Sequence, residues 1–133
     1  MTVFEMRIKA APGDIDALGH VNNAVFVRWI QDMATAHWLE VAEPAHGEAS
    51  VWVVTRHEID YLRPVGPGET VTGRTWVPDA PKGARFDRHV EFVGDDGRTR
   101  VRAKTSWAII DQASGRAIRV PREVAEPFLA VRK

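Results

Sequence analysis

One loop near the start of the chain holds most of the side chains whose types and spacing suit acyl chemistry. They are Asp14, Asp16, His20, Asn22 and Asn23, and they stand directly before an expected helix. The unpaired N–H groups and the dipole of a helix N-terminus favour an oxyanion. Acyl transfer needs such donors where charge develops on a carbonyl oxygen, with a nucleophile or base close by. A carboxylate of this loop could attack a carbonyl itself or deprotonate a water.

The same residue types also have purely structural uses. Asp and Asn commonly cap helices and close tight turns, and His20 could satisfy a buried backbone carbonyl. The residue types alone leave both interpretations open.

The loop is expected to lie between a strand at residues 3–10 and a long helix from residue 24 to about residue 42. Apolar residues in the helix recur at spacings of three and four, and Val25, Val27 and Leu39 widen the apolar arc over most of its circumference. A helix of this kind is usually surrounded by protein.

Four further strands are expected after the helix, separated by Gly- and Pro-containing breaks that suit turns. They span residues 51–63, 70–77, 85–93 and 98–110, and a short helix is expected at 121–128. The GDDG sequence before the last strand is typical of a hairpin turn. The fold class is therefore α+β, with a long central helix wrapped by a curved antiparallel sheet of about five strands.

Composition limits the remaining possibilities. A chain of 133 residues with a formal net charge of zero and no cysteine fits a single domain over residues 1–133. The neutral balance gives no reason to expect nucleic acid or an anionic membrane as partner, and the missing cysteine removes thiol catalysis. No signal peptide and no long apolar stretch is visible, so we expect a cytoplasmic protein. The histidines show no ligand spacing, so no metal site is expected.

Two motifs carry a resemblance to a known family. The sequence D-x-D-x-x-G-H-V-N-N begins at Asp14, and I-D-Y-L-R-P-V-x-x-G-E-x-V begins at Ile59. Together they resemble the hotdog-fold acyl-CoA thioesterases, in particular the branch of 4-hydroxybenzoyl-CoA thioesterase and related bacterial enzymes. The resemblance implies hydrolysis of an acyl-CoA thioester to free acid and coenzyme A, with coenzyme A as part of the substrate and no separate cofactor.

The resemblance also implies roles for the loop residues. Asp16 matches the catalytic carboxylate, and the backbone N–H near Asn23 matches the donor that polarises the thioester carbonyl. Gly19, His20 and Asn22 complete the motif, and we expect His20 to orient groups rather than act as base. The family usually dimerises by joining two sheets edge to edge, with active sites at the subunit interface, and pairs such dimers in several ways, so a homodimer or a homotetramer is expected.

Two points leave the family's site incomplete. Phe26 stands where many relatives carry tyrosine, so a hydroxyl contact there is not implied. Some branches use a Glu, Thr or Ser on a partner helix as base, and Asp32 and Thr35 lie roughly two to three turns along this helix. The sequence leaves open which group positions and deprotonates the attacking water.

Substrate contacts can be assigned by residue type. Trp29 and Met33 on the central helix could line an apolar acyl pocket. Arg63 and Arg88 are candidates for the phosphates of coenzyme A, because arginine grips phosphate by forked hydrogen bonds. The last long strand carries four cations on one face. We expect this face either to lie in solvent or to form a rim that binds anions. The cations are Arg98, Arg100, Arg102 and Lys104.

Three alternatives remain beside an acyl-CoA thioesterase. An acyl-carrier-protein thioesterase could use the same site, because both carriers present pantetheine. A hotdog enoyl-thioester hydratase usually shows D-x-N-P-x-H, whereas here Asp16 and His20 are four apart without the Asn and Pro. A non-catalytic acyl-thioester-binding protein would use Asp16 only as a structural residue.

Overall fold

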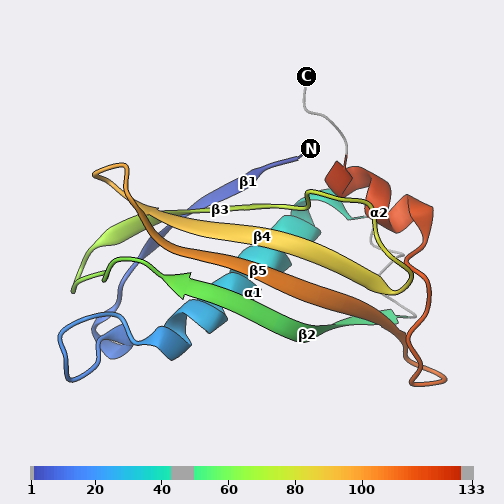
Figure 1. The fold of residues 1–133 in the computed structure, drawn as a ribbon, viewed down its shortest axis with the longest axis horizontal. Helices are drawn as coiled ribbons and strands as arrows, with labels where there is room; N and C mark the ends of the chain where they lie inside the picture. The colour runs from blue at the N-terminus through green and yellow to red at the C-terminus, as the bar shows by residue number, and fades with distance from the viewer. Residues whose placement is uncertain (1, 43–49, 130–133) are drawn as a thin grey trace.

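The computed structural model describes residues 2–42 and 50–129. The elements in chain order, shown in Figure 1, are β1 (Phe4–Lys9), a 3-10 turn η1 (Pro12–Asp14), α1 (Asn23–Val41), β2 (Ser50–Tyr61), β3 (Thr70–Trp76), β4 (Arg85–Gly94), β5 (Thr99–Asp111) and α2 (Arg122–Leu129). The expected strands and helices are confirmed, each to within one or two residues at its ends.

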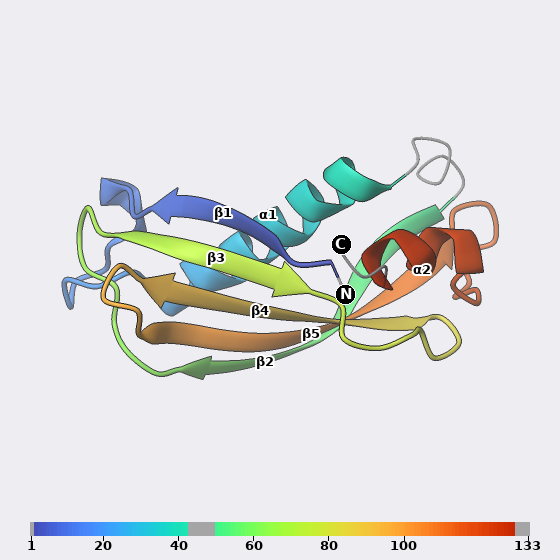
Figure 2. The same cartoon turned by 90° about the horizontal axis from the view of Figure 1, so that it is seen from above.

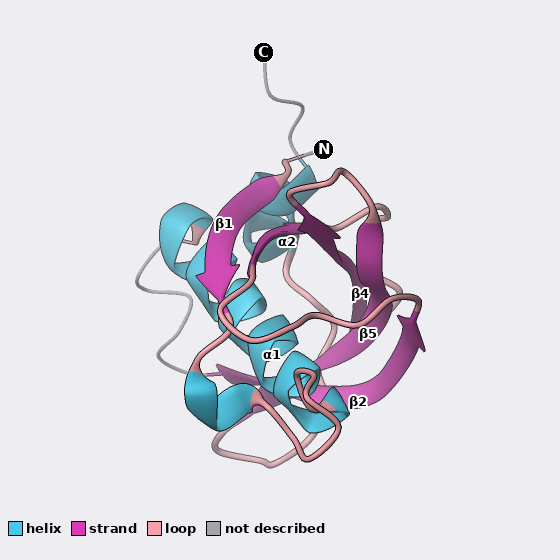
Figure 3. Ribbon diagram, turned by 90° about the vertical axis from the view of Figure 1, so that its left-hand side faces the viewer, coloured by secondary structure: helices cyan, strands magenta, loops and turns pink. Residues whose placement is uncertain are grey.

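The strands form one antiparallel sheet of five, in the order β1-β3-β4-β5-β2. The sheet curls around α1, which lies along its concave face (Figure 3). The GDDG hairpin is present, since the Gly94 N–H donates to the Arg98 carbonyl at 3.0 Å between β4 and β5. β1 and β2 are the two edges of the sheet, and the α+β hotdog architecture expected from the sequence is confirmed.

Alternation on the strands divides the sheet into a buried inner face and a more exposed outer face. On β3 every second residue is buried, and the buried side chains of α1 pack against this face. Gly73 lets the helix approach closely, because a Cβ there would stand 2.7 Å from Met33 Sδ and 3.3 Å from Phe92 Cε1. A second cluster, which includes Val77, Phe86 and Phe128, joins the far end of the sheet to α2.

One expectation about the helix is wrong. The sequence pattern adds Leu39 to the buried arc of α1, but its side chain is 76% exposed. The sheet covers only one side of the helix, so the opposite side faces outward (Figure 2). Neither helix within the described residues 2–42 and 50–129 combines the length and the apolar character that crossing a membrane requires.

Candidate active site

The loop before α1 folds into a small hairpin. The Asn22 N–H donates to the Asp14 carbonyl and the Asp16 N–H to the His20 carbonyl, both at 2.9 Å. The Gly19 N–H closes the turn onto the Asp16 carbonyl at 3.0 Å, and Gly19 has a φ of +81°, which side-chain-bearing residues rarely adopt. The hairpin therefore holds Asp16 and His20 next to the start of the helix.

The two aspartates of the motif have different surroundings. Asp14 is buried, accepts the Ala11 N–H at Oδ2 (2.9 Å) and pairs with Arg28 Nη2 at Oδ1 (2.6 Å). The Ala11 N–H and then the Arg28 guanidinium hold the pKa of Asp14 below its ordinary value. One oxygen of Asp14 thus closes the turn that begins at Ala11, and the other ties the loop to Arg28 of α1.

Asp16 is only partly buried and faces no cation among the described residues. Its Oδ1 accepts the Leu18 N–H at 2.9 Å, which fixes the carboxylate on its own turn. Its Oδ2 has no hydrogen-bond partner in the part of the chain that the structure describes. Asp16 is therefore the carboxylate of the motif with an oxygen available for chemistry.

The first turn of α1 has one unused amide. Asn22 caps the helix, since its Oδ1 accepts the Ala24 N–H at 2.8 Å and its carbonyl accepts the Val25 N–H at 2.9 Å. The Asn23 N–H has no acceptor within residues 2–42 and 50–129. His20 is exposed, and its ring makes no hydrogen bond to any described residue. The helix start thus presents a free donor beside the hairpin that carries Asp16.

One residue at this site was missed by the sequence reasoning. The hydroxyl of Tyr61, at the end of β2, donates to the Asn23 carbonyl at 3.1 Å. Its ring packs edge-on against Phe26 with 5.9 Å between centroids, and partial burial raises the pKa of Tyr61. The hydroxyl that Phe26 lacks is therefore present nearby on another element. The sequence signal was the position of Tyr61 in the second motif, at the end of an expected strand.

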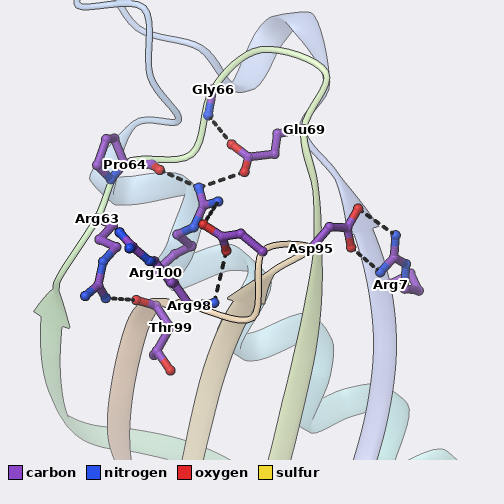
Figure 4. Close-up of polar contacts among 10 residues, drawn as sticks. Arg7, Arg63, Pro64, Gly66, Glu69, Asp95, Arg98, Thr99 and Arg100 are labelled. Atoms are coloured by element: carbon purple, nitrogen blue, oxygen red, sulfur yellow. Dashed lines mark hydrogen bonds and ion pairs between the residues drawn. The ribbon is translucent and has the colours of Figure 1, made fainter.

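Two further loops lie at the same end of the molecule as the hairpin (Figures 1 and 2). The Val21 N–H donates to the Val65 carbonyl at 2.8 Å, which ties the hairpin to the segment after β2. Arg63 in that segment is exposed, and its Nη1 donates to the Thr99 carbonyl at 2.8 Å (Figure 4). Arg63 is thus a surface cation near the candidate site.

The cations of β5 do not form the uniform rim suggested by the sequence. Arg100 is largely buried, because it donates to the Pro64 carbonyl at 2.9 Å and pairs with Glu69 at 2.7 Å (Figure 4). The register shifts between Phe92 and Val93, which face this part of β5. Arg100 therefore ties loops together inside the molecule, while Arg98 and Arg102 remain exposed.

The expected pocket residues lie in two different places. Trp29 and Met33 are 3% and 0% exposed and belong to the core between α1 and the sheet. A cavity of about 210 Å³ lies farther along the helix, and Arg88, also expected to contact substrate, is in its wall. It is lined by Ala34, Thr35, Trp38, Trp52, Val77, Phe86, Asp87, Arg88, Trp107 and Phe128.

Across the described ranges, no three His, Asp or Glu side chains gather in a way that could hold a metal ion. The arrangement at the hairpin consists instead of one available carboxylate and one free amide. Such a pair can polarise a carbonyl and supply a nucleophile or base.

Comparison with known proteins assigns the chain to a family. The sequence profile of the thioesterase-like superfamily matches residues 10–128. The chain is 29% identical over 79 residues to the chloroplastic acyl-[acyl-carrier-protein] hydrolase FATB3 of Cuphea viscosissima, covering 59% of this chain and 19% of that protein. The chain therefore spans about a fifth of the length of this curated relative.

Solved structures share the fold at low sequence identity. The DHNA-CoA thioesterase of Staphylococcus aureus superposes with a TM-score of 0.82 at 18% identity, covering 92% of this chain and 83% of that one. A 1,4-dihydroxy-2-naphthoyl-CoA thioesterase from Synechocystis has a TM-score of 0.78 at 15% identity, covering 92% of both chains. The profile match over most of the sequence shows that the chain belongs to the thioesterase-like superfamily.

Proposed function

We propose that this protein is an acyl-CoA thioesterase in which Asp16 and the Asn23 N–H act on the thioester. The observation that carries the proposal is the free Asn23 N–H at the start of α1, beside the hairpin that presents Asp16 with an oxygen unpaired among the described residues. The helix dipole adds to this donor, because it favours negative charge at the helix N-terminus.

The reaction follows from these two groups. The Asn23 N–H binds the thioester carbonyl oxygen and stabilises the negative charge that develops on it. The Asp16 carboxylate adds to the carbonyl carbon or takes a proton from a water that adds. The carbon–sulfur bond then breaks and coenzyme A leaves as its thiolate. When water adds, the acyl group is released directly as a carboxylic acid. When Asp16 adds, a mixed anhydride forms, and a water then cleaves it to the carboxylic acid and the free Asp16 carboxylate. The thiolate is a good leaving group, so the site needs no strong acid.

The coenzyme A end would lie toward the exposed arginines of the same end of the molecule. Arg63 and Arg98 lie on the segment after β2 and beside the β4–β5 hairpin turn (Figure 4). Neither forms an ion pair with a described residue. Exposed guanidinium groups without carboxylate partners suit the nucleotide phosphates. The two structural relatives act on CoA thioesters by name, which supports this carrier, whereas the name of the curated relative gives acyl carrier protein as the second candidate.

The active unit would be a homodimer joined through β2. This edge strand and the residue after it expose large apolar side chains: Val51, Val53, Tyr61 and Leu62, each 40% to 44% exposed. An unpaired edge with apolar side chains is a template for pairing with a second strand. Pairing of two β2 edges would bring a second copy beside the Tyr61 end of the site.

A substrate panel tests the proposal. Purified protein is mixed with acyl-CoA thioesters of varied chain length and with aryl-CoA thioesters, and released thiol is followed with a thiol-trapping dye. Thiol release from at least one of them is expected, and Asp16→Asn should lower kcat by about 10²-fold or more. Asp79→Asn, an exposed aspartate in the β3–β4 connection, is the matched control.

Other outcomes separate the alternatives. No thiol release from any acyl-CoA, with release from acyl-carrier-protein substrates, would assign the carrier protein instead. Loss of an enoyl-CoA without thiol release would indicate a hydratase. Full activity in Asp16→Asn would remove Asp16 from the mechanism.

A further inference from the structure

A buried arginine lies in the wall of the cavity far from the Asp16 hairpin. Arg88 on β4 is 7% exposed, and within the described parts of the chain no carboxylate pairs with it. Its Nη1 lies 3.1 Å from Thr75 Oγ1 and 2.8 Å from His37 Nδ1, and its guanidinium stands 5.6 Å from the Phe128 ring centre. None of these three neighbours carries a negative charge.

The contact with His37 fixes the state of the imidazole. A guanidinium has only donors, so His37 Nδ1 must accept and the ring proton must lie on Nε2. His37 is therefore neutral and provides no negative charge. A buried cation without an anion is unfavourable, and burial lowers the pKa of Arg88 to about 10. An anion entering the cavity would relieve this cost.

Asp87 also lines the cavity, but its negative charge is compensated by cations other than Arg88. Its two oxygens accept from Arg85 Nε at 2.8 Å and Arg85 Nη2 at 2.9 Å, and Lys104 Nζ lies at 3.8 Å. Asp87 is therefore neutralised by two cations other than Arg88. The cavity keeps one unbalanced positive charge.

The rest of the wall suits the apolar part of a ligand. Aromatic rings dominate it, from Trp38, Trp52, Phe86, Trp107 and Phe128. The indole N–H of Trp107 is buried and has no acceptor among the described residues, so it is a second unused donor in the wall. A cavity of about 210 Å³ holds a group of roughly six to eight heavy atoms, since a cavity of about 150 Å³ holds benzene.

From these observations we propose that the cavity selects acyl groups that end in a carboxylate, with Arg88 binding that carboxylate through its forked donors. This inference rests on the proposed thioesterase function and names its substrate class. Thr75 positions the guanidinium, because its hydroxyl also donates to the His89 carbonyl at 2.8 Å and is thereby fixed on the sheet. The aromatic wall takes the carbon chain between thioester and carboxylate.

The position of the cavity fits this role in the proposed dimer. Within one copy, Ala34 in the cavity wall lies roughly 16 Å along α1 from Asn23. β2 connects the two places, because Trp52 lines the cavity and Tyr61 contacts the start of the helix. When two β2 edges pair antiparallel, the cavity end of one copy lies beside the Asp16 end of the other. Each cavity would then serve the thioester site of the partner copy.

Binding is tested without catalysis. Tryptophan fluorescence reports on the cavity, since three of its wall residues are tryptophans: Trp38, Trp52 and Trp107. Benzoate and hexanoate should bind at least about tenfold more tightly than benzamide and hexanamide, and Arg88→Met should abolish this difference. Arg7→Met, on the surface of β1, is the matched control and should keep it. Equal binding of acid and amide would overturn the proposal.

Folding of the variant is checked by its melting temperature. Arg88→Met removes a buried charge, so it should be at least as stable as the native protein. Should it fail to fold, Arg88→Lys replaces it, since this variant keeps the charge without the fork and should lower the preference for the acid. An unchanged preference in Arg88→Lys would equally overturn the proposal.

Hydrolysis then separates this inference from the proposed function. The native protein should hydrolyse a six-carbon acyl-CoA ending in a second carboxylate with a kcat/KM at least about tenfold above that of hexanoyl-CoA, and Arg88→Met should reverse this order. Equal rates for both thioesters would overturn the inference while leaving the thioesterase intact. Hydrolysis of neither, nor of any other acyl-CoA of the panel, with benzoate bound as expected, would overturn the thioesterase instead.

Mixed dimers test which site the cavity serves. Copies carrying Asp16→Asn and copies carrying Arg88→Met are co-expressed and the hybrid is isolated by two affinity tags. If the cavity serves the partner, the hybrid has one complete site and regains activity on the carboxylate-ended thioester. A hybrid as inactive on it as both parents would contradict the arrangement across the dimer.

Discussion

The hydroxyl of Tyr61 donates a hydrogen bond to the Asn23 carbonyl 3.1 Å away, and so links the end of the sheet's edge strand to the first residue of the central helix. The same residue, Asn23, carries the free N–H proposed to bind the thioester oxygen. The position of that donor therefore depends on both β2 and α1.

Tyr61→Phe should lower kcat by about fivefold, because a single hydrogen bond contributes about 1 kcal/mol to positioning the helix start. The ring contact with Phe26 is kept, so the melting temperature should fall by only a few degrees. Steady-state kinetics on the preferred thioester, with circular dichroism for stability, check this. Unchanged kcat would show that the hydroxyl does not position the donor.

The cap residue Asn22 allows stability and catalysis to be changed separately. Asn22→Ala should cost about 1 kcal/mol of unfolding free energy, because the Ala24 N–H loses its acceptor. Asn22→Asp keeps the cap and suits the helix dipole, but it places a negative charge beside the developing oxyanion. For Asn22→Asp we expect native stability and a kcat lower by about tenfold or more. Urea denaturation measures the stability of both variants, and steady-state kinetics measure their kcat. Full activity in Asn22→Asp would argue against an oxyanion at this helix start.

Asp14 should govern stability at acid pH. Its pKa is held below the ordinary 3.8 by the Ala11 N–H and Arg28, so the ionised form is favoured in the folded state. The resulting stability is fully present above that ordinary value and is lost as the pH falls through the lower folded value. Asp14→Asn should be less stable at neutral pH and should lose less on acidification. Urea denaturation of both proteins between neutral pH and about pH 3 measures this, and parallel curves would contradict it.

Gly73→Ala should destabilise the protein by about 1 to 3 kcal/mol through overpacking. The added Cβ would stand 2.7 Å from Met33 Sδ in a fully buried contact between β3 and α1. The double variant Gly73→Ala, Met33→Ala removes the clash. Its loss of stability should therefore be smaller than the sum of the losses in the two single variants. Thermal unfolding of the single and double variants provides the comparison. Additive losses would show that the helix does not depend on this close approach.

The local parts of the fold and site could be predicted from sequence. Turn residues and alternation predicted each strand, and the order of types in the loop predicted a cap and a carboxylate at the start of α1. The difference between Asp14 and Asp16 could not be predicted, because it depends on Arg28 reaching back from the helix. Tyr61 was missed for a similar reason, since its partner lies 38 positions away in the sequence.

Two arginines show where the alternation of inward and outward residues along a strand predicts burial and where it does not. Arg88 shares the inward register of Phe86 and Val90 on β4, so the pattern contained the signal that it is buried. Arg100 gave no such signal, because its burial depends on the Pro64 carbonyl and the Glu69 carboxylate, which lie on the connection between β2 and β3. Only the packed structure distinguishes it from its exposed neighbour Arg102.

The division between the two aspartates of the hairpin also bears on how this protein could evolve. Asp14 maintains the loop and Asp16 is the carboxylate proposed to react, so mutation at position 16 alone could abolish hydrolysis without unfolding the hairpin. A lineage could thereby turn an enzyme into a thioester carrier or sensor by one amino-acid replacement, with the ligand cavity inherited unchanged.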